Sequence, residues 1–148
     1  MLFRTHLVIA LFFILLFFSS ITNPVLFIST AIFATLLPDI DSPTSKLGHY
    51  KIFRPLNFFT KHRGIIHSLT FLFLISIFLF LFWKEILIPF VFGYSLHLFL
   101  DGITVQGVNL FYPAKIKMRW IIRTGGIAEI FIFTAFVFAD LFFIFKLF

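Results

Sequence analysis

Five histidines and six acidic residues carry most of the chemistry that this sequence offers. The clearest pair is His97 and Asp101, because the spacing i, i+4 places both side chains on one face of a helix, with Cβ atoms about 5–6 Å apart. The two side chains can bind one metal ion together, or Asp101 can orient the imidazole through a hydrogen bond. The alternative is that the two residues form a purely structural ion pair at the end of a helix. The spacing alone does not decide between a metal site and an ion pair.

A second pair of histidines lies in the segment His-Arg-Gly-Ile-Ile-His. In one straight helix the five-residue spacing would point His62 and His67 roughly 140° apart. Gly64 allows His62 to lie in a loop while His67 occupies the first turn of a helix, so that both converge on one centre. The alternative is a polar loop followed by a capping histidine.

The remaining candidates stand at the edges of apolar runs. Asp39 and Asp41 lie two residues apart on a segment bounded by prolines, which can aim both carboxylates at a cation, although capping around prolines is common. His6 and Glu129 stand close to the ends of apolar runs and are weak signals singly. His49, in a loop, is the least convincing of the histidines.

Taken together, these residues predict a metal site. Ionisable groups in apolar surroundings are costly and need partners or a metal. Imidazole and carboxylate ligands without thiolate suit zinc, with manganese and iron as alternatives, and the ligands suffice for one or two ions. The expected metal ligands are His6, Asp39, Asp41, His62, His67, His97, Asp101 and Glu129.

An open metal site beside basic side chains suits hydrolysis, because the metal lowers the pKa of a bound water toward 7 and polarises a carbonyl or phosphoryl oxygen. We expect Asp41 or His62 to act as general base or acid. Arg63 would contact an anionic substrate.

The composition indicates the kind of fold that must position these residues. Of 148 residues, 61% are hydrophobic and 12% are charged, and the mean hydropathy is +1.10. So few polar residues cannot coat a soluble fold, and disorder is excluded by the same numbers. The chain has no cysteine, which excludes disulfide scaffolds and thiolate metal sites. The fold class expected is an all-α polytopic membrane bundle.

Apolar runs predict five spans within one integral membrane domain over residues 1–148. Three of the runs are short for about 30 Å of hydrocarbon. The first two could form one re-entrant hairpin instead, which gives four membrane elements. A cleaved signal peptide is an alternative for the first run, but no clean cleavage site follows Ser19 and Ser20. The predicted spans are 7–21, 25–37, 64–83, 86–100 and 126–145.

The basic residues predict the orientation. With five spans, the N-terminus and the polar stretches 38–63 and 101–125 share one side, which holds ten of the twelve Lys and Arg residues. The positive-inside rule then places the N-terminus and the metal site at the cytoplasmic face of the cell (inner) membrane. The net charge of +6 suits anionic headgroups, and no nucleic-acid partner is expected. Residues 115–123 mix cations with Trp120 and predict an interfacial anchor, with a substrate gate as the alternative.

Three segments carry a family resemblance: Leu-Pro-Asp-Ile-Asp-Ser, His-Arg-Gly-Ile-Ile-His-Ser and Gly-Tyr-Ser-Leu-His-Leu-Phe-Leu-Asp-Gly-Ile-Thr. They resemble the YdjM-like family of membrane-bound metal-dependent hydrolases. That family is in turn distantly similar to the zinc-dependent phospholipase C and S1-P1 nuclease group, whose His-x-x-x-Asp helix pair His97 and Asp101 match. Those soluble enzymes carry a further His-x-x-x-Glu pair. Here Gly125 precedes Glu129 at that spacing, so one or two metals are expected rather than three.

The function predicted is therefore a membrane-bound metal-dependent hydrolase that acts on a phosphoester or other ester, with a membrane lipid among the candidate substrates. The alternative is a non-catalytic metal-binding membrane protein, such as a sensor, scaffold or carrier. A lipid-domain or assembly protein is a third hypothesis. Neither the substrate nor the oligomeric state follows from the sequence.

Overall fold

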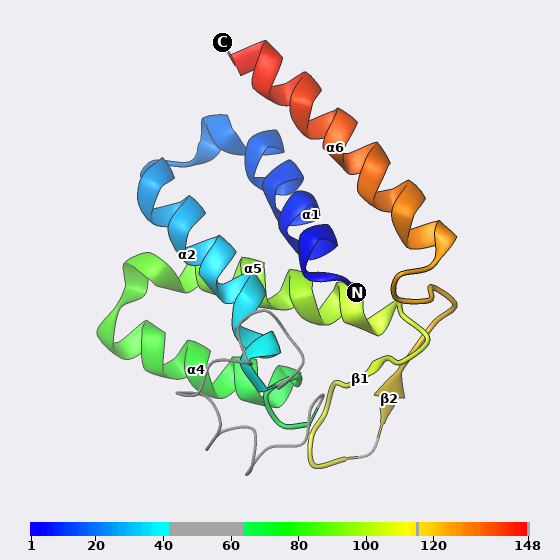
Figure 1. Cartoon of the computed structure of the whole chain (residues 1–148). Helices are drawn as coiled ribbons and strands as arrows, with labels where there is room; N and C mark the ends of the chain where they lie inside the picture. The colour runs from blue at the N-terminus through cyan, green and yellow to red at the C-terminus, as the bar shows by residue number, and fades with distance from the viewer. Residues whose placement is uncertain (42–63, 115, 148) are drawn as a thin grey trace.

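The computed structural model describes residues 1–41, 64–114 and 116–147, and the all-helical expectation is confirmed over most of them (Figure 1). A short two-stranded hairpin is the exception. The helices are α1 (Phe3–Leu16), α2 (Pro24–Leu36), α4 (Leu69–Phe82), α5 (Lys84–Gly102) and α6 (Ile127–Leu147), with 3-10 turns η1 (Phe18–Ser20) and η2 (Leu37–Asp41) and strands β1 (Val108–Asn109) and β2 (Lys117–Met118).

The third apolar run begins its helix later than predicted. Ser68 caps α4 by accepting a hydrogen bond from the backbone N–H of Phe71, a common way to satisfy a free amide at a helix start. His67 therefore lies in the turn before the helix and not in its first turn, which corrects the expected start at Gly64. The turn is held by the Ser68 hydroxyl, which donates to the Ile65 carbonyl at 2.5 Å.

The close packing of α2 on α5 forms the centre of the molecule. A Cβ placed on Gly93 would lie 2.1 Å from the carbonyl oxygen of Ala31 and 2.9 Å from the Thr35 hydroxyl. The missing side chain thus lets the two backbones approach, as small residues do between membrane helices. Tyr94 and Leu98 of α5 continue this contact into the main apolar cluster.

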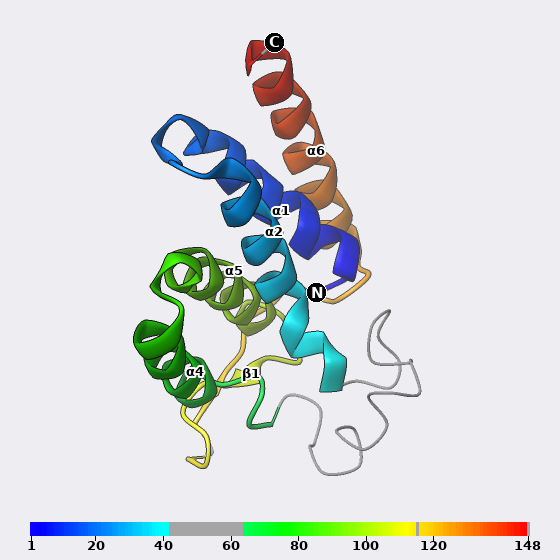
Figure 2. The ribbon, with the colours of Figure 1, turned by 90° about the vertical axis from the view of Figure 1, so that its left-hand side faces the viewer.

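Helix α6 packs against α1 on the other side of the bundle. The ring of Phe12 meets those of Phe136 and Phe143 edge to face, with centroids 4.9 and 5.7 Å apart. Figures 1 and 2 show these helices side by side, with the α4–α5 hairpin lying across the other face of α2. This arrangement gathers the N-terminus, the end of α2, the end of α5 and the start of α6 at one end of the molecule.

Two of the described helices, α5 and α6, are long and apolar enough to cross a membrane by themselves. The others have 14, 13 and 14 residues, about 20 Å of helix at 1.5 Å per residue. The number of spans therefore stays a prediction.

Candidate metal centre

Five of the predicted ligands meet at this end of the bundle, although they come from four separate segments. His6 lies in the first turn of α1, Asp39 in η2, His67 in the turn before α4, and His97 and Asp101 in the last turns of α5. The three imidazoles are at most 1% exposed, and the Asp101 side chain is 3% exposed. Asp39, at 17%, is the most accessible of the five.

Their donor atoms form two overlapping groups that share His97. In each group, His6–His97–Asp101 and Asp39–His67–His97, the candidate ligand atoms lie within 4.8 Å of one another. The Nε2 atom of His97 is 3.3 Å from Nε2 of His67 and 3.9 Å from Oδ1 of Asp39.

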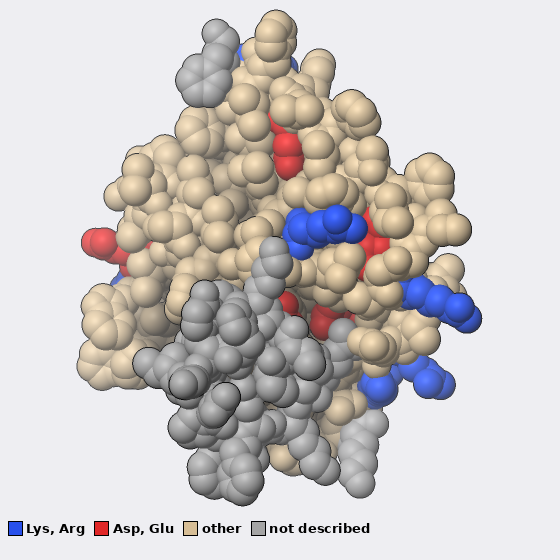
Figure 3. Space-filling view, in the orientation of Figure 1, with Lys and Arg blue, Asp and Glu red and all other residues tan. Residues whose placement is uncertain are grey.

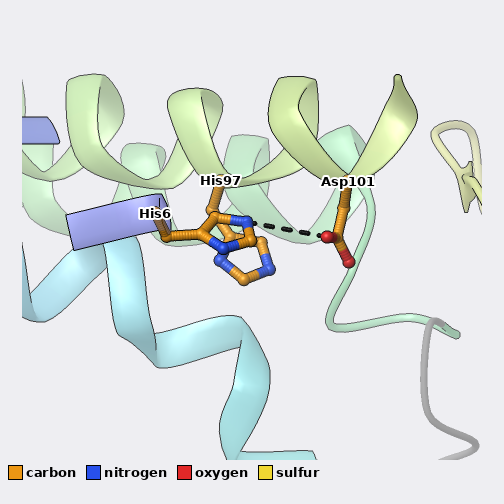
Figure 4. A group of neighbouring side chains, drawn as sticks. All are labelled: His6, His97 and Asp101. Atoms are coloured by element: carbon orange, nitrogen blue, oxygen red, sulfur yellow. Dashed lines mark ion pairs between the residues drawn. The ribbon is translucent and has the colours of Figure 1, made fainter. Parts of the chain in front are cut away.

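Asp101 connects the two groups. Its carboxylate lies 3.6 Å from His6 Nε2 and 4.0 Å from His67 Nε2. Figure 4 shows the stacked rings of His6 and His97 and the ion pair between His6 and Asp101. Each group is thus compact enough to bind one ion. His97 can serve either group but not two ions at once, because its Nε2 carries a single lone pair.

Backbone carbonyls set which imidazole nitrogen faces the centre. Nδ1 of His97 lies 2.7 Å from the carbonyl oxygen of Thr35, and Nδ1 of His6 lies 3.1 Å from that of Leu2. A carbonyl can only accept, so each Nδ1 carries the proton and each neutral ring presents a bare Nε2 lone pair. This is the tautomer that a metal ligand needs.

The charges and the unpaired polar atoms of the site favour a bound cation. Among the described residues, the buried Nε2 atom of His6 has no hydrogen-bond partner, and an unsatisfied buried nitrogen is costly. Two carboxylates and two imidazole lone pairs converge here, whereas the one positive group described beside them is the amino group of Met1, which donates to Asp101. Burial raises the pKa of the Asp39 carboxyl, and the charge of Asp101 raises it further. A divalent ion would favour the charged carboxylate.

Glu129, predicted as a ligand, belongs to neither group. Its Oε1 accepts from the backbone N–H of Leu2 and its Oε2 from that of Gly125, both at 2.6 Å. Glu129 therefore joins the start of α1 to the start of α6, which is a structural role. The predicted residues His49, His62 and Arg63, and the side chain of Asp41, lie outside the described residues.

Two residues that position the ligands were not anticipated. Thr35 supplies the carbonyl that holds His97, and any residue type can supply a carbonyl, so the sequence carries no signal for it. Tyr94, fully buried, donates through its hydroxyl to the carbonyl of Ile66. It thereby fixes the turn that carries His67. A tyrosine within an apolar run is the one sequence signal, since its hydroxyl needs a partner when buried.

Comparisons with known proteins give one family and three relatives. Residues 1–146 match the family described as YdjM inner membrane protein. The chain is 30% identical over 133 residues to the uncharacterized protein YvsG of Bacillus subtilis, covering 85% of this chain and 82% of that protein. It is 36% identical over 101 residues to the inner membrane protein YdjM of Escherichia coli, covering 62% of this chain and 52% of that one, and the Shigella flexneri protein matches equally. No solved structure matches.

Proposed function

The chain belongs to the YdjM inner membrane protein family, and we propose that it is a multi-pass inner-membrane hydrolase that depends on a divalent metal. The observation that carries this proposal is the convergence of three imidazoles and two carboxylates from four segments, with the tautomers of two imidazoles set for ligation. The ligand chemistry favours zinc, with manganese or iron as alternatives, bound as one or two ions.

The proposed reaction is hydrolysis of a phosphoester or other ester. A divalent ion held by His6, His67, His97, Asp39 and Asp101 would lower the pKa of a bound water and polarise the scissile group. Asp39 is the partly exposed ligand and so marks the side from which water and substrate enter. Asp41 or His62 as general base or acid, and Arg63 as the anion contact, stay predictions from the sequence. So does the distant kinship with the zinc-dependent phospholipase C group.

The proposed orientation places the site at the cytoplasmic face. Ten of the twelve Lys and Arg residues lie in segments that five spans would put on that side. Helices α1, α2 and α4 would then cross as short elements supported by the longer α5 and α6.

A non-catalytic metal-binding protein is the second candidate. The observation that favours it is the depth of the ligands, since the three histidines are nearly or wholly buried. Catalysis requires an open coordination position, whereas a structural or sensory ion is served by an enclosed one.

Metal content of the detergent-purified protein tests both candidates. We expect stoichiometric transition metal in the wild type and its loss in His97→Ala and Asp101→Asn. Glu85→Gln, which removes an exposed carboxylate at the other end of α5, should keep the metal. Wild-type protein without metal would overturn both candidates. Bound metal with no turnover of phosphodiester, phosphomonoester or phospholipid substrates would support the second candidate over the first.

A further inference from the structure

The connection between the two longest helices has an unusual composition. Residues 103–126, here called the arm, join α5 to α6 and contain Lys115, Lys117, Arg119 and Arg123 but no Asp or Glu. Cations alternate with apolar residues in its second half. A charge of one sign without internal partners indicates that the arm is built to meet negative charge elsewhere.

The arm is hydrogen-bonded to the end of α5 that carries Asp101. Thr104, fully buried, donates through its hydroxyl to the carbonyl of Asp101 at 2.7 Å and accepts from the Gly107 N–H at 3.3 Å. The two halves of the arm pair through β1 and β2, with Val108 opposite Met118. The arm is therefore anchored to the turn that carries one of the candidate ligands.

Close approach of the backbone keeps the two halves together. Gly107 has φ +63°, and a Cβ there would lie 2.2 Å from the carbonyl oxygen of Met118. The N–H of Trp120 donates to the Thr104 carbonyl at 3.1 Å, and the N–H of Val105 donates to the Ile122 carbonyl at 2.9 Å. The side chains of the second half are thus presented from a fixed backbone.

Those side chains point outward. Lys117, Arg119 and Arg123 are exposed, and so are Trp120 at 64% and Ile121 at 78%. A shallow recess of about 450 Å³ is lined by Val105, Arg119, Trp120 and Ile121. Figure 3 shows blue side chains projecting at the edge of the molecule where Figure 1 draws β2.

The location of the arm between two candidate spans indicates what it binds. It leaves the end of one candidate span and enters the start of the next, so in a membrane it lies at the boundary between hydrocarbon and water. Trp favours this boundary, and Lys and Arg beside it meet the lipid phosphates. On this surface the exposed cationic groups match the phosphate of a lipid headgroup. The exposed apolar groups beside them match the upper part of its acyl chain.

We propose that the arm is a binding surface for anionic phospholipid headgroups, with Lys117, Arg119 and Arg123 contacting the phosphates and Trp120 and Ile121 entering the interface. The binding surface rests on the membrane placement within the proposed function, and the substrate class named next rests also on the proposed hydrolysis. Because the arm is fixed beside Asp101, it would supply phosphate-bearing lipids to the metal centre, which names anionic phospholipids as the substrate class.

The two tryptophans allow a direct test. Trp83 and Trp120 are the only ones in the chain, so Trp83→Phe leaves Trp120, within the arm, as the only indole, and it is excited selectively at a wavelength that tyrosine does not absorb. The protein is reconstituted into phosphatidylcholine vesicles that contain brominated phosphatidylglycerol or brominated phosphatidylcholine, whose bromines quench a nearby indole. We expect Trp120 to be half-quenched at a mole fraction of the anionic lipid at least about threefold lower than that of the neutral lipid.

Two comparisons make the result specific. Lys117→Gln, Arg119→Gln and Arg123→Gln combined should remove the preference, and these exposed positions tolerate the change without loss of the fold. In the Trp120→Phe protein, Trp83 reports the opposite end, where Lys84 and Glu85 offset each other, and should show no preference. Equal quenching of Trp120 by both lipids, or a preference that survives the triple substitution, would overturn the proposal and favour a protein partner for the arm. Neither result depends on bound metal or turnover.

Discussion

At the scale of single residues, the candidate centre depends on groups that hold the ligands as much as on the ligands. Pro38 lacks an N–H, so it cannot supply the 3-10 hydrogen bond to the Thr35 carbonyl three residues before it. That carbonyl instead accepts from Nδ1 of His97 at 2.7 Å. The proline beside Asp39 therefore has a second consequence, because it leaves free the Thr35 carbonyl, which helps to set the tautomer of a histidine 62 residues further along the chain than Thr35.

The Tyr94→Phe substitution tests whether a residue that is not itself a ligand positions one. The change leaves the buried carbonyl of Ile66 without the Tyr94 hydroxyl and loosens the turn that carries His67. We expect metal affinity to fall about tenfold while the bundle loses only about 1 kcal/mol of stability. Competition with a chromogenic chelator measures the affinity. Tyr112→Phe, at an exposed position, should change neither value, and unchanged affinity in Tyr94→Phe would exclude a positioning role.

At the scale of elements, α5 is the helix on which the candidate centre is built. It carries both His97 and Asp101, and one turn before His97 it carries Gly93, where α2 comes closest. The contact between α2 and α5 therefore sets the distance between His97 and the Thr35 carbonyl. The same α2–α5 interface therefore determines both the packing of the two helices and the position of a candidate metal ligand.

Gly93→Ala is expected to weaken both the packing of α2 on α5 and the binding of metal. Its Cβ would overlap the Ala31 carbonyl oxygen, and backbone atoms cannot move aside as a side chain can, so we expect a loss of about 1–3 kcal/mol in stability together with weaker metal binding. Denaturation in mixed detergent measures the first and metal titration the second. Gly102→Ala is the matched control, because its Cβ would meet only the flexible Met118 side chain at 2.9 Å. Equal losses in the two variants would contradict the interpretation.

At the scale of the whole molecule, a bound ion would connect segments that are remote in the chain. His6, Asp39, His67 and His97 span α1, η2, the turn before α4 and α5. An ion bound only by the folded chain stabilises it by mass action.

Metal removal is therefore expected to lower stability. If the ion is present at 100 to 1,000 times its Kd, chelation should cost about 3–4 kcal/mol. The expected result is a lower Tm with EDTA, restored by added zinc, measured by thermal unfolding in detergent. His97→Ala should show little further decrease on chelation. A wild-type Tm that EDTA leaves unchanged would argue against a metal that bridges these segments.

The absence of cysteine from the sequence allows the orientation to be tested with single cysteines. Thr22 and Ala114 are exposed positions that five spans place on opposite sides of the membrane. In intact cells, an impermeant maleimide should label Thr22→Cys and should reach Ala114→Cys only after lysis. The reverse pattern would place the candidate centre on the outer side, and labelling of both would contradict an odd number of spans between them.

The sequence alone predicted the helical class and most of the helix positions, because apolar runs and their polar breaks are local properties. It also predicted five of the residues that meet at the candidate centre, since ionisable side chains at the ends of apolar runs need partners. Ligation by Glu129 stays a prediction: the residue belongs to neither candidate group, and its two oxygens accept backbone N–H groups of Leu2 and Gly125. A carboxylate at a helix start serves amide groups as readily as it serves a cation.

Only the tertiary structure decided which residues meet and which nitrogen each histidine presents. The contact of His6 with His97, and of Asp39 with His67, joins residues that no local pattern relates. The Thr35 and Ile66 carbonyls are backbone groups, which every residue type shares, so their roles exist only once α2 and the turn before α4 are packed against α5. Local pattern determines where polar groups interrupt the apolar chain, whereas the packing of helices at Gly93 determines the space in which those groups converge.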